Sequence, residues 1–96
     1  MTIVKVRAGA CGFSTCVKAQ KENRREVRLT LESDCASVAD LGFILEELGV
    51  LGMKDVISTD RVKNQIFKAA ADTLPHSACP VPVALLKAAE VALGIN

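Results

Sequence analysis

The sequence predicts an α+β domain: a three-stranded antiparallel sheet followed by three helices packed on one face. Apolar and polar side chains alternate over the first third of the chain, which is the period of β-strands. Apolar residues then recur at three- and four-residue spacing, which is the period of helices. Strands followed by helices are typical of a helical layer covering an antiparallel sheet. The 96 residues are too few for two independent cores, so we expect a single domain over residues 1–96.

Three segments are expected to form the strands. Residues 2–8 alternate between aliphatic and basic or polar side chains. A glycine-rich stretch follows at 8–16, where the backbone can turn tightly. Residues 16–20 alternate again, and the polar residues 21–24 predict a hairpin turn. The clearest strand is 27–32, which has three aliphatic side chains on one face.

The first predicted helix begins near residue 33. Ser33 or Asp34 is expected to cap it, which places Cys35 in its first turn. Gly49 is expected to end it. Its apolar stripe consists of Val38, Leu41, Leu45 and Leu48.

Two more helices are expected in the second half of the chain. Residues 58–60 offer a cap for the second helix, and Pro75 closes it. In the last helix Cys79 is expected at the cap, Pro80 suits the first helical position, and Gly94 is the end. The second stripe consists of Val62, Ile66, Ala69, Ala70 and Thr73, and the third of Leu85, Leu86, Ala89 and Leu93.

Composition and charge argue against several classes of partner. Twelve basic and eleven acidic residues leave the chain nearly neutral, and it contains no Trp or Tyr. Nucleic acid and anionic membranes are therefore not expected as partners. No apolar run reaches the length of a membrane span, and the N-terminus reads as a strand instead of a signal peptide. We expect a cytoplasmic protein, whose cysteines would not form structural disulfides.

Four cysteines are the candidate functional residues. Cys11 and Cys16 flank the glycine-rich turn, whereas Cys35 and Cys79 fall at the starts of two predicted helices. Helix starts carry unpaired N–H groups and favour negative charge. If the turn and both helix starts share one end of the sheet, all four sulfur atoms can meet there. Each cysteine also has a simpler interpretation as a small buried side chain.

A convergent set of four cysteines predicts a metal or iron–sulfur site. Both zinc and iron–sulfur clusters are held by four thiolates. Structural zinc sites usually pair cysteines two to four residues apart, but here one C-x₄-C pair is followed by two isolated cysteines. The spacing therefore favours a cluster, with four irons ahead of two, and leaves zinc as the alternative.

His76 and Phe13 lie next to these cysteines in the sequence. His76 precedes Cys79 by three residues and could replace a cysteine ligand, donate a hydrogen bond beside the site, or carry a proton. It could equally be a solvated loop residue. Phe13 is expected to be either a lid over the cysteines or a core residue.

The cysteine pattern resembles that of a family of small bacterial and archaeal domains. The segments 9–13 and 76–82, together with Cys16 and Cys35, carry the resemblance. The family is of about this length, is found largely in anaerobes, and is uncharacterised in function. The resemblance implies only that the cysteines are the functional centre.

A second, local resemblance suggests an alternative function. Cys79-Pro80-Val81-Pro82 is similar to the CPxP motif of the sulfur-carrier family, in which the cysteine carries a persulfide at a helix start. Cys79 would then be a reactive thiolate with His76 as base. Whether the chain is an enzyme stays open. An accessory or electron-transfer role implies a partner protein, and the high aliphatic content is compatible with a homodimer.

Overall fold

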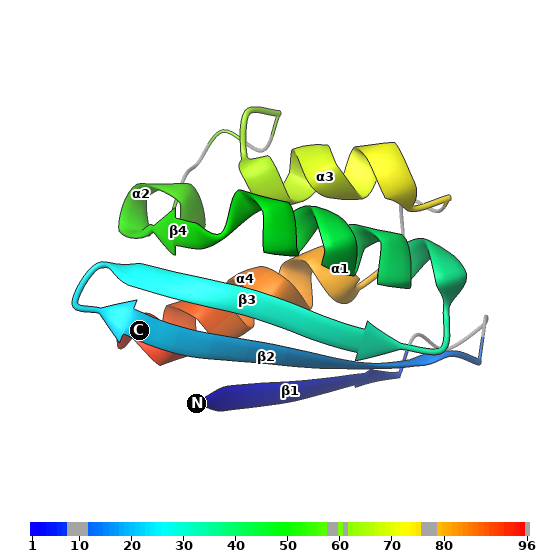
Figure 1. The fold of residues 1–96 in the computed structure, drawn as a ribbon, viewed down its shortest axis with the longest axis horizontal. Helices are drawn as coiled ribbons and strands as arrows, with labels where there is room; N and C mark the ends of the chain where they lie inside the picture. The colour runs from blue at the N-terminus through cyan, green and yellow to red at the C-terminus, as the bar shows by residue number, and fades with distance from the viewer. Residues whose placement is uncertain (8–11, 58–59, 61, 76–78, 96) are drawn as a thin grey trace.

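A four-stranded antiparallel sheet forms one side of the protein (Figure 1). The computed structural model describes residues 1–7, 12–57, 60, 62–75 and 79–95. Neighbouring strands pair in sequence order. The strands are β1 (Thr2–Arg7), β2 (Ser14–Asn23), β3 (Glu26–Ser33) and β4 (Val50–Gly52).

Helices cover one face of this sheet. α4 packs against β1, β2 and β3 and lies behind the sheet in Figure 1, whereas α1 packs against β3 and α3. The sequence-based expectation of an α+β fold is therefore right, but three strands and three helices were expected and four of each are described. The helices are α1 (Ala36–Leu48), α2 (Met53–Val56), α3 (Gln65–Thr73) and α4 (Val81–Leu93).

The two additional elements are short. β4 pairs only with the first three residues of β3, and α2 follows it directly. A three-residue strand is too short to show alternation, and a four-residue helix is too short to show a stripe. Both depend on tertiary contacts: Leu51 of β4 and Val56 of α2 are buried in the core.

Strand alternation decides which side chains enter the core. Val17 and Ala19 of β2 and Leu29 of β3 are buried against the helices, where Leu41 and Leu85 meet them. Successive side chains of a strand point to opposite faces. The intervening residues of β1, β2 and β3 therefore lie on the face that no described helix covers.

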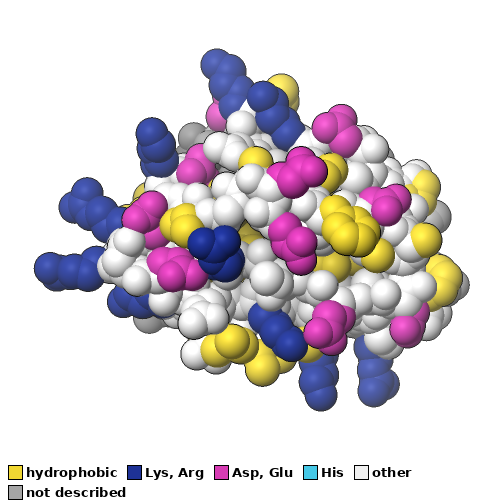
Figure 2. All heavy atoms as spheres, viewed as in Figure 1, with side chains coloured by type: hydrophobic (Ala, Val, Ile, Leu, Met, Phe, Trp, Pro, Cys, Tyr) yellow, Lys and Arg dark blue, Asp and Glu magenta, His cyan; other side chains and the backbone are white. Residues whose placement is uncertain are grey.

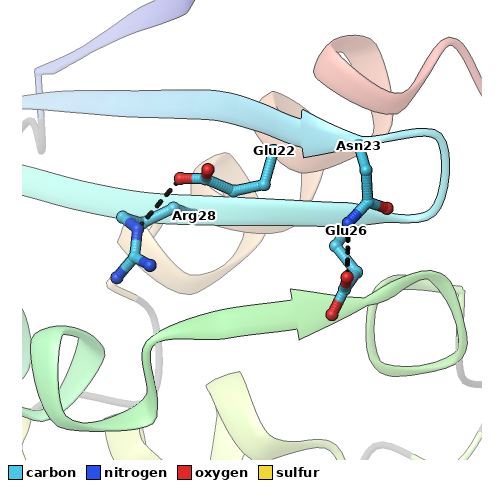
Figure 3. Close-up of polar contacts among 4 residues, drawn as sticks. All are labelled: Glu22, Asn23, Glu26 and Arg28. Atoms are coloured by element: carbon cyan, nitrogen blue, oxygen red, sulfur yellow. Dashed lines mark hydrogen bonds and ion pairs between the residues drawn. The ribbon is translucent and has the colours of Figure 1, made fainter.

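The β2–β3 hairpin turns two residues later than expected. Its turn residues are Arg24 and Arg25, and the pairing register shifts between Lys21 and Asn23. The Asn23 side chain accepts a hydrogen bond from the Arg25 N–H at 3.0 Å and donates one to Glu26 (Figure 3). Asparagine forms such local bonds readily, which explains why it ends the strand.

An ion pair supports the hairpin on the uncovered face. Arg28 Nε lies 3.0 Å from Glu22 Oε1 (Figure 3). The hairpin also carries two further exposed basic side chains, Arg24 and Arg25.

Helix ends follow the sequence more closely than helix starts. Gly49 and Gly94 cap the C-termini of α1 and α4 with positive φ values of 68° and 75°, and α3 ends before Pro75. The expected start of α3 was wrong. Asn64 is its N-cap, because the Asn64 side chain accepts hydrogen bonds from two N–H groups of the first turn. Val62, expected on the apolar stripe, precedes the helix and is 82% exposed; Ser58 and Thr59 lie outside the described residues.

Candidate functional site

Cys35 and Cys79 line the same pocket. This cavity of about 310 Å³ lies where α1 and α4 begin, and Phe13, Thr15, Leu74 and Val81 supply other parts of its wall. The two cysteines are 44 positions apart in the sequence, yet both helix starts face one partly open and largely apolar pocket. Both side chains are half-buried, and both are free thiols.

Cys35 is held by the last residue of β3. The Ser33 hydroxyl accepts a hydrogen bond from the Cys35 N–H at 3.1 Å and donates one to the Ser14 carbonyl at 3.3 Å. It also bonds the buried Thr15 hydroxyl at 2.7 Å. These bonds tie the start of α1 to the ends of two strands. Cys35 is itself the N-cap residue, one position earlier than the first-turn placement that the sequence suggested.

Cys79 precedes the cap of α4. Pro80 is the N-cap, and not the first helical residue as expected, so Cys79 lies one position before the cap. Pro82 is buried at the second helical position, where its missing N–H costs no hydrogen bond. The two prolines restrict the backbone that follows Cys79, which fixes the direction in which the helix leaves the pocket.

Both helix starts favour negative charge in the pocket. Neither α1 nor α4 has a side-chain cap, and neither carries an acidic residue in its first turn. The first N–H groups of a helix have no partner within the helix, and the helix dipole places partial positive charge there. Two helix starts open on this one pocket. The pocket therefore suits thiolates, or an anionic group that accepts hydrogen bonds from the helix N–H groups.

Phe13 lies at the edge of the pocket. Its ring lines the cavity, yet it remains 42% exposed. It follows Gly12, whose positive φ of 72° favours glycine. Of the two expectations for Phe13, the lid fits this position and the buried core residue does not.

Cys16 is on the other side of the sheet. Thr15, Val17 and their alternate neighbours face the helices, so Cys16 faces away from them. It pairs with Lys5 on β1 and Glu32 on β3 and lines a separate hollow with them. The structure therefore does not bring Cys16 into the pocket of Cys35 and Cys79. The alternation of Val17 and Ala19 in the sequence already indicates that Cys16 lies on the opposite face of its strand.

Cys11 and His76 lie outside the described residues. Phe13, two positions after Cys11, and Pro75, directly before His76, both line the pocket. Among the residues that the structure does describe, no three His, Cys, Asp or Glu side chains are grouped closely enough to hold a metal ion.

Thr15 and Leu74 were missed as wall residues of the pocket. Thr15 alternates in step with Val17 and Ala19 along β2, so the sequence did place it on the face of the sheet that the helices cover. Leu74 ends α3, and its position depends on how α3 packs, for which the sequence gives no local signal.

Comparison with known families accounts for nearly the whole chain. A family model described as a family of unknown function, DUF6951, matches residues 2–96. The chain belongs to DUF6951. No curated protein and no solved structure matches it.

The DUF6951 match spans all segments of the candidate site. It covers the glycine-rich segment 8–16, the starts of α1 and α4 with Cys35 and Cys79, and the sequence around His76. None of the described helices of this DUF6951 chain is long and apolar enough to cross a membrane.

Proposed function

We propose that the protein binds an iron–sulfur cluster, or alternatively zinc, through Cys35 and Cys79 in the pocket between α1 and α4. One observation supports this most strongly: two cysteines from distant parts of the chain line one cavity at two uncapped helix starts. The bound group would serve electron transfer or an accessory role toward a partner protein.

The surroundings of Cys35 and Cys79 suit a thiolate-held group. Zinc and iron–sulfur clusters both bind deprotonated cysteines, so the complete site carries concentrated negative charge. N–H groups and helix dipoles stabilise such charge, and an apolar wall with Phe13 at its edge limits access of water.

Two cysteines alone do not complete a site of this kind. Cys11 and His76 are the proposed additional ligands, because each is close in sequence to a residue of the pocket wall, Phe13 or Pro75. Three cysteines and one histidine form a common zinc set, and mixed cysteine–histidine ligation also occurs in iron–sulfur proteins. The structure favours this set over one that includes Cys16.

Metal analysis of purified protein tests the proposal. The full chain is produced with iron and sulfide available and purified without oxygen, and its iron, labile sulfide, zinc and visible spectrum are measured. We expect stoichiometric metal in the unaltered protein and at least a tenfold lower content in Cys35→Ser and in Cys79→Ser. Cys16→Ser is the matched control and should keep its metal. Circular dichroism of each variant shows whether the fold is intact.

The outcomes separate the competing hypotheses. Unaltered protein without iron or zinc, in which Cys79 is alkylated much faster than Cys35, would contradict metal binding and favour the sulfur-carrier alternative. Loss of metal in Cys16→Ser would instead support the four-cysteine set expected from the sequence.

A further inference from the structure

One broad surface of the protein is formed by two parts of opposite charge. The uncovered face of the sheet and the outer side of α1 are seen together in the view of Figure 1, with α4 behind. Figure 2 shows acidic side chains over α1 and basic side chains along the β1 edge in this same view. We call this the mixed face; it consists of the outward residues of β1, β2, β3 and α1.

The acidic half is the exposed stripe of α1. Asp40, Phe43 and Glu47 follow one another at helical spacing and are exposed, and Glu46 lies beside them. α1 contains no Lys or Arg, and within the described part of the chain none of its acidic side chains has an ion-pair partner. Phe43 is 65% exposed, although the chain has only three aromatic residues.

The basic half is β1. Lys5 and Arg7 lie on the uncovered face and are exposed, and neither side chain has an ion-pair partner among the described residues. The cations on the same face of β2 and β3 already have ion-pair partners. Lys18 lies 3.5 Å from Glu32, and Arg28 lies 3.0 Å from Glu22. On the uncovered face of β1, β2 and β3, the cations without an ion-pair partner among the described residues are therefore Lys5 and Arg7, beside Ile3, which is 54% exposed. Further exposed cations, Arg24 and Arg25, lie at the hairpin tip, outside the proposed contact.

The charge distribution of the mixed face is self-complementary. β1 is the edge strand on one side of the sheet, and α1 packs against β3 toward the opposite side, where the short β4 pairs only with the first residues of β3 (Figure 1). A two-fold axis parallel to the strands would place β1 of one copy over α1 of a second copy. Each dimer would then contain two equivalent acid–base contacts, with Phe43 and Ile3 adding apolar contact area.

We infer that the mixed face is the interface of a homodimer, in which the acidic side of α1 meets the basic edge strand β1 of the second copy. A second copy fits better than an unrelated partner because both charges needed for complementarity are on this one surface. Cys16 lies between the two halves, so the dimer would cover it.

Paired charge reversals test the inference. Variant one carries Lys5→Glu and Arg7→Glu, which makes both halves acidic; variant two carries Asp40→Lys and Glu47→Lys, which makes both halves basic. Light scattering after size-exclusion chromatography should give a dimer mass for the unaltered protein and a monomer mass for each variant. An equimolar mixture should restore the dimer, because both contacts then join opposite charges.

A matched control and a second measurement keep the test decisive. Arg24→Glu with Arg25→Glu changes the charge equally at the hairpin tip and should leave the dimer intact. Alkylation of Cys16 should be at least fivefold slower in the unaltered protein than in either reversed variant. A monomer at every concentration, or a mixture that stays monomeric, would overturn the inference. Metal content is independent of these outcomes, since Cys35 and Cys79 are unchanged.

Discussion

Asn64 shows how a single buried polar side chain can connect two helices. It is only 3% exposed, and its side-chain oxygen accepts hydrogen bonds from the N–H groups of Ile66 and Phe67 at 2.9 and 3.3 Å. Its amide nitrogen donates to the Asp55 carbonyl in α2 at 2.7 Å. The residue therefore caps α3 and at the same time fixes α2 against it.

Replacement of Asn64 should separate these two roles. We expect Asn64→Ala to lower the free energy of unfolding by about 2 kcal/mol, since the cap is lost and a carbonyl is left without its donor. Asn64→Ser keeps a capping oxygen and should cost about half as much. Urea denaturation followed by circular dichroism measures both. Equal losses in the two variants would show that the cap contributes nothing.

At the scale of elements, the two long helices end in different backbone conformations. Gly94 ends α4 with φ 75° and ψ 22°, which lies in the left-handed helical region. Gly49 ends α1 with φ 68° and ψ −125°, a combination that other residues hardly adopt. An added Cβ has space at both positions, so only the backbone distinguishes them.

The two glycines should therefore respond differently to alanine. We expect Gly49→Ala to destabilise the protein by about 2 kcal/mol and Gly94→Ala by about 1 kcal/mol. Thermal unfolding of the two single variants beside the unaltered chain provides the comparison. A larger loss of stability in Gly94→Ala than in Gly49→Ala would contradict the argument that the backbone conformation of Gly49 is the harder one for alanine to adopt.

At the scale of the whole molecule, one core joins the sheet to the helices. α4 is central to it because it contacts three strands as well as α2 and α3. Leu85 is completely buried among these elements, whereas the adjacent Leu86 is only partly buried. The stability of a chain of this size rests on few such residues.

Leu85→Ala should therefore cost most of the stability margin. We expect a loss of about 3 kcal/mol, from the lost burial and the cavity left behind, and a loss less than half as large for Leu86→Ala. Both changes remove the same atoms from neighbouring positions of one helix, so helix propensity cancels in the comparison. Equilibrium urea unfolding of both variants measures the difference, and similar losses would contradict the central position of α4.

Local patterns in the sequence predicted much of the fold. Alternation located the three longer strands, helical spacing located α1, α3 and α4, and glycine or proline marked their ends. These features depend on neighbouring residues, whose side chains and backbone preferences are present in the sequence itself. The start of α3 was misplaced because residues 58–60 and Asn64 offer equally suitable capping side chains, and packing against α2 selected Asn64.

By itself, the sequence determined which of the longer segments are strands and which are helices, and it placed two cysteines at or beside helix starts. Only the tertiary structure decided that Cys35 and Cys79 share a pocket, whereas strand alternation in the sequence already separates Cys16 from the helix side of the sheet. Contact between residues 44 positions apart results from how α1 and α4 pack on the strands. Packing is a property of the assembled core, and no short stretch of sequence encodes it.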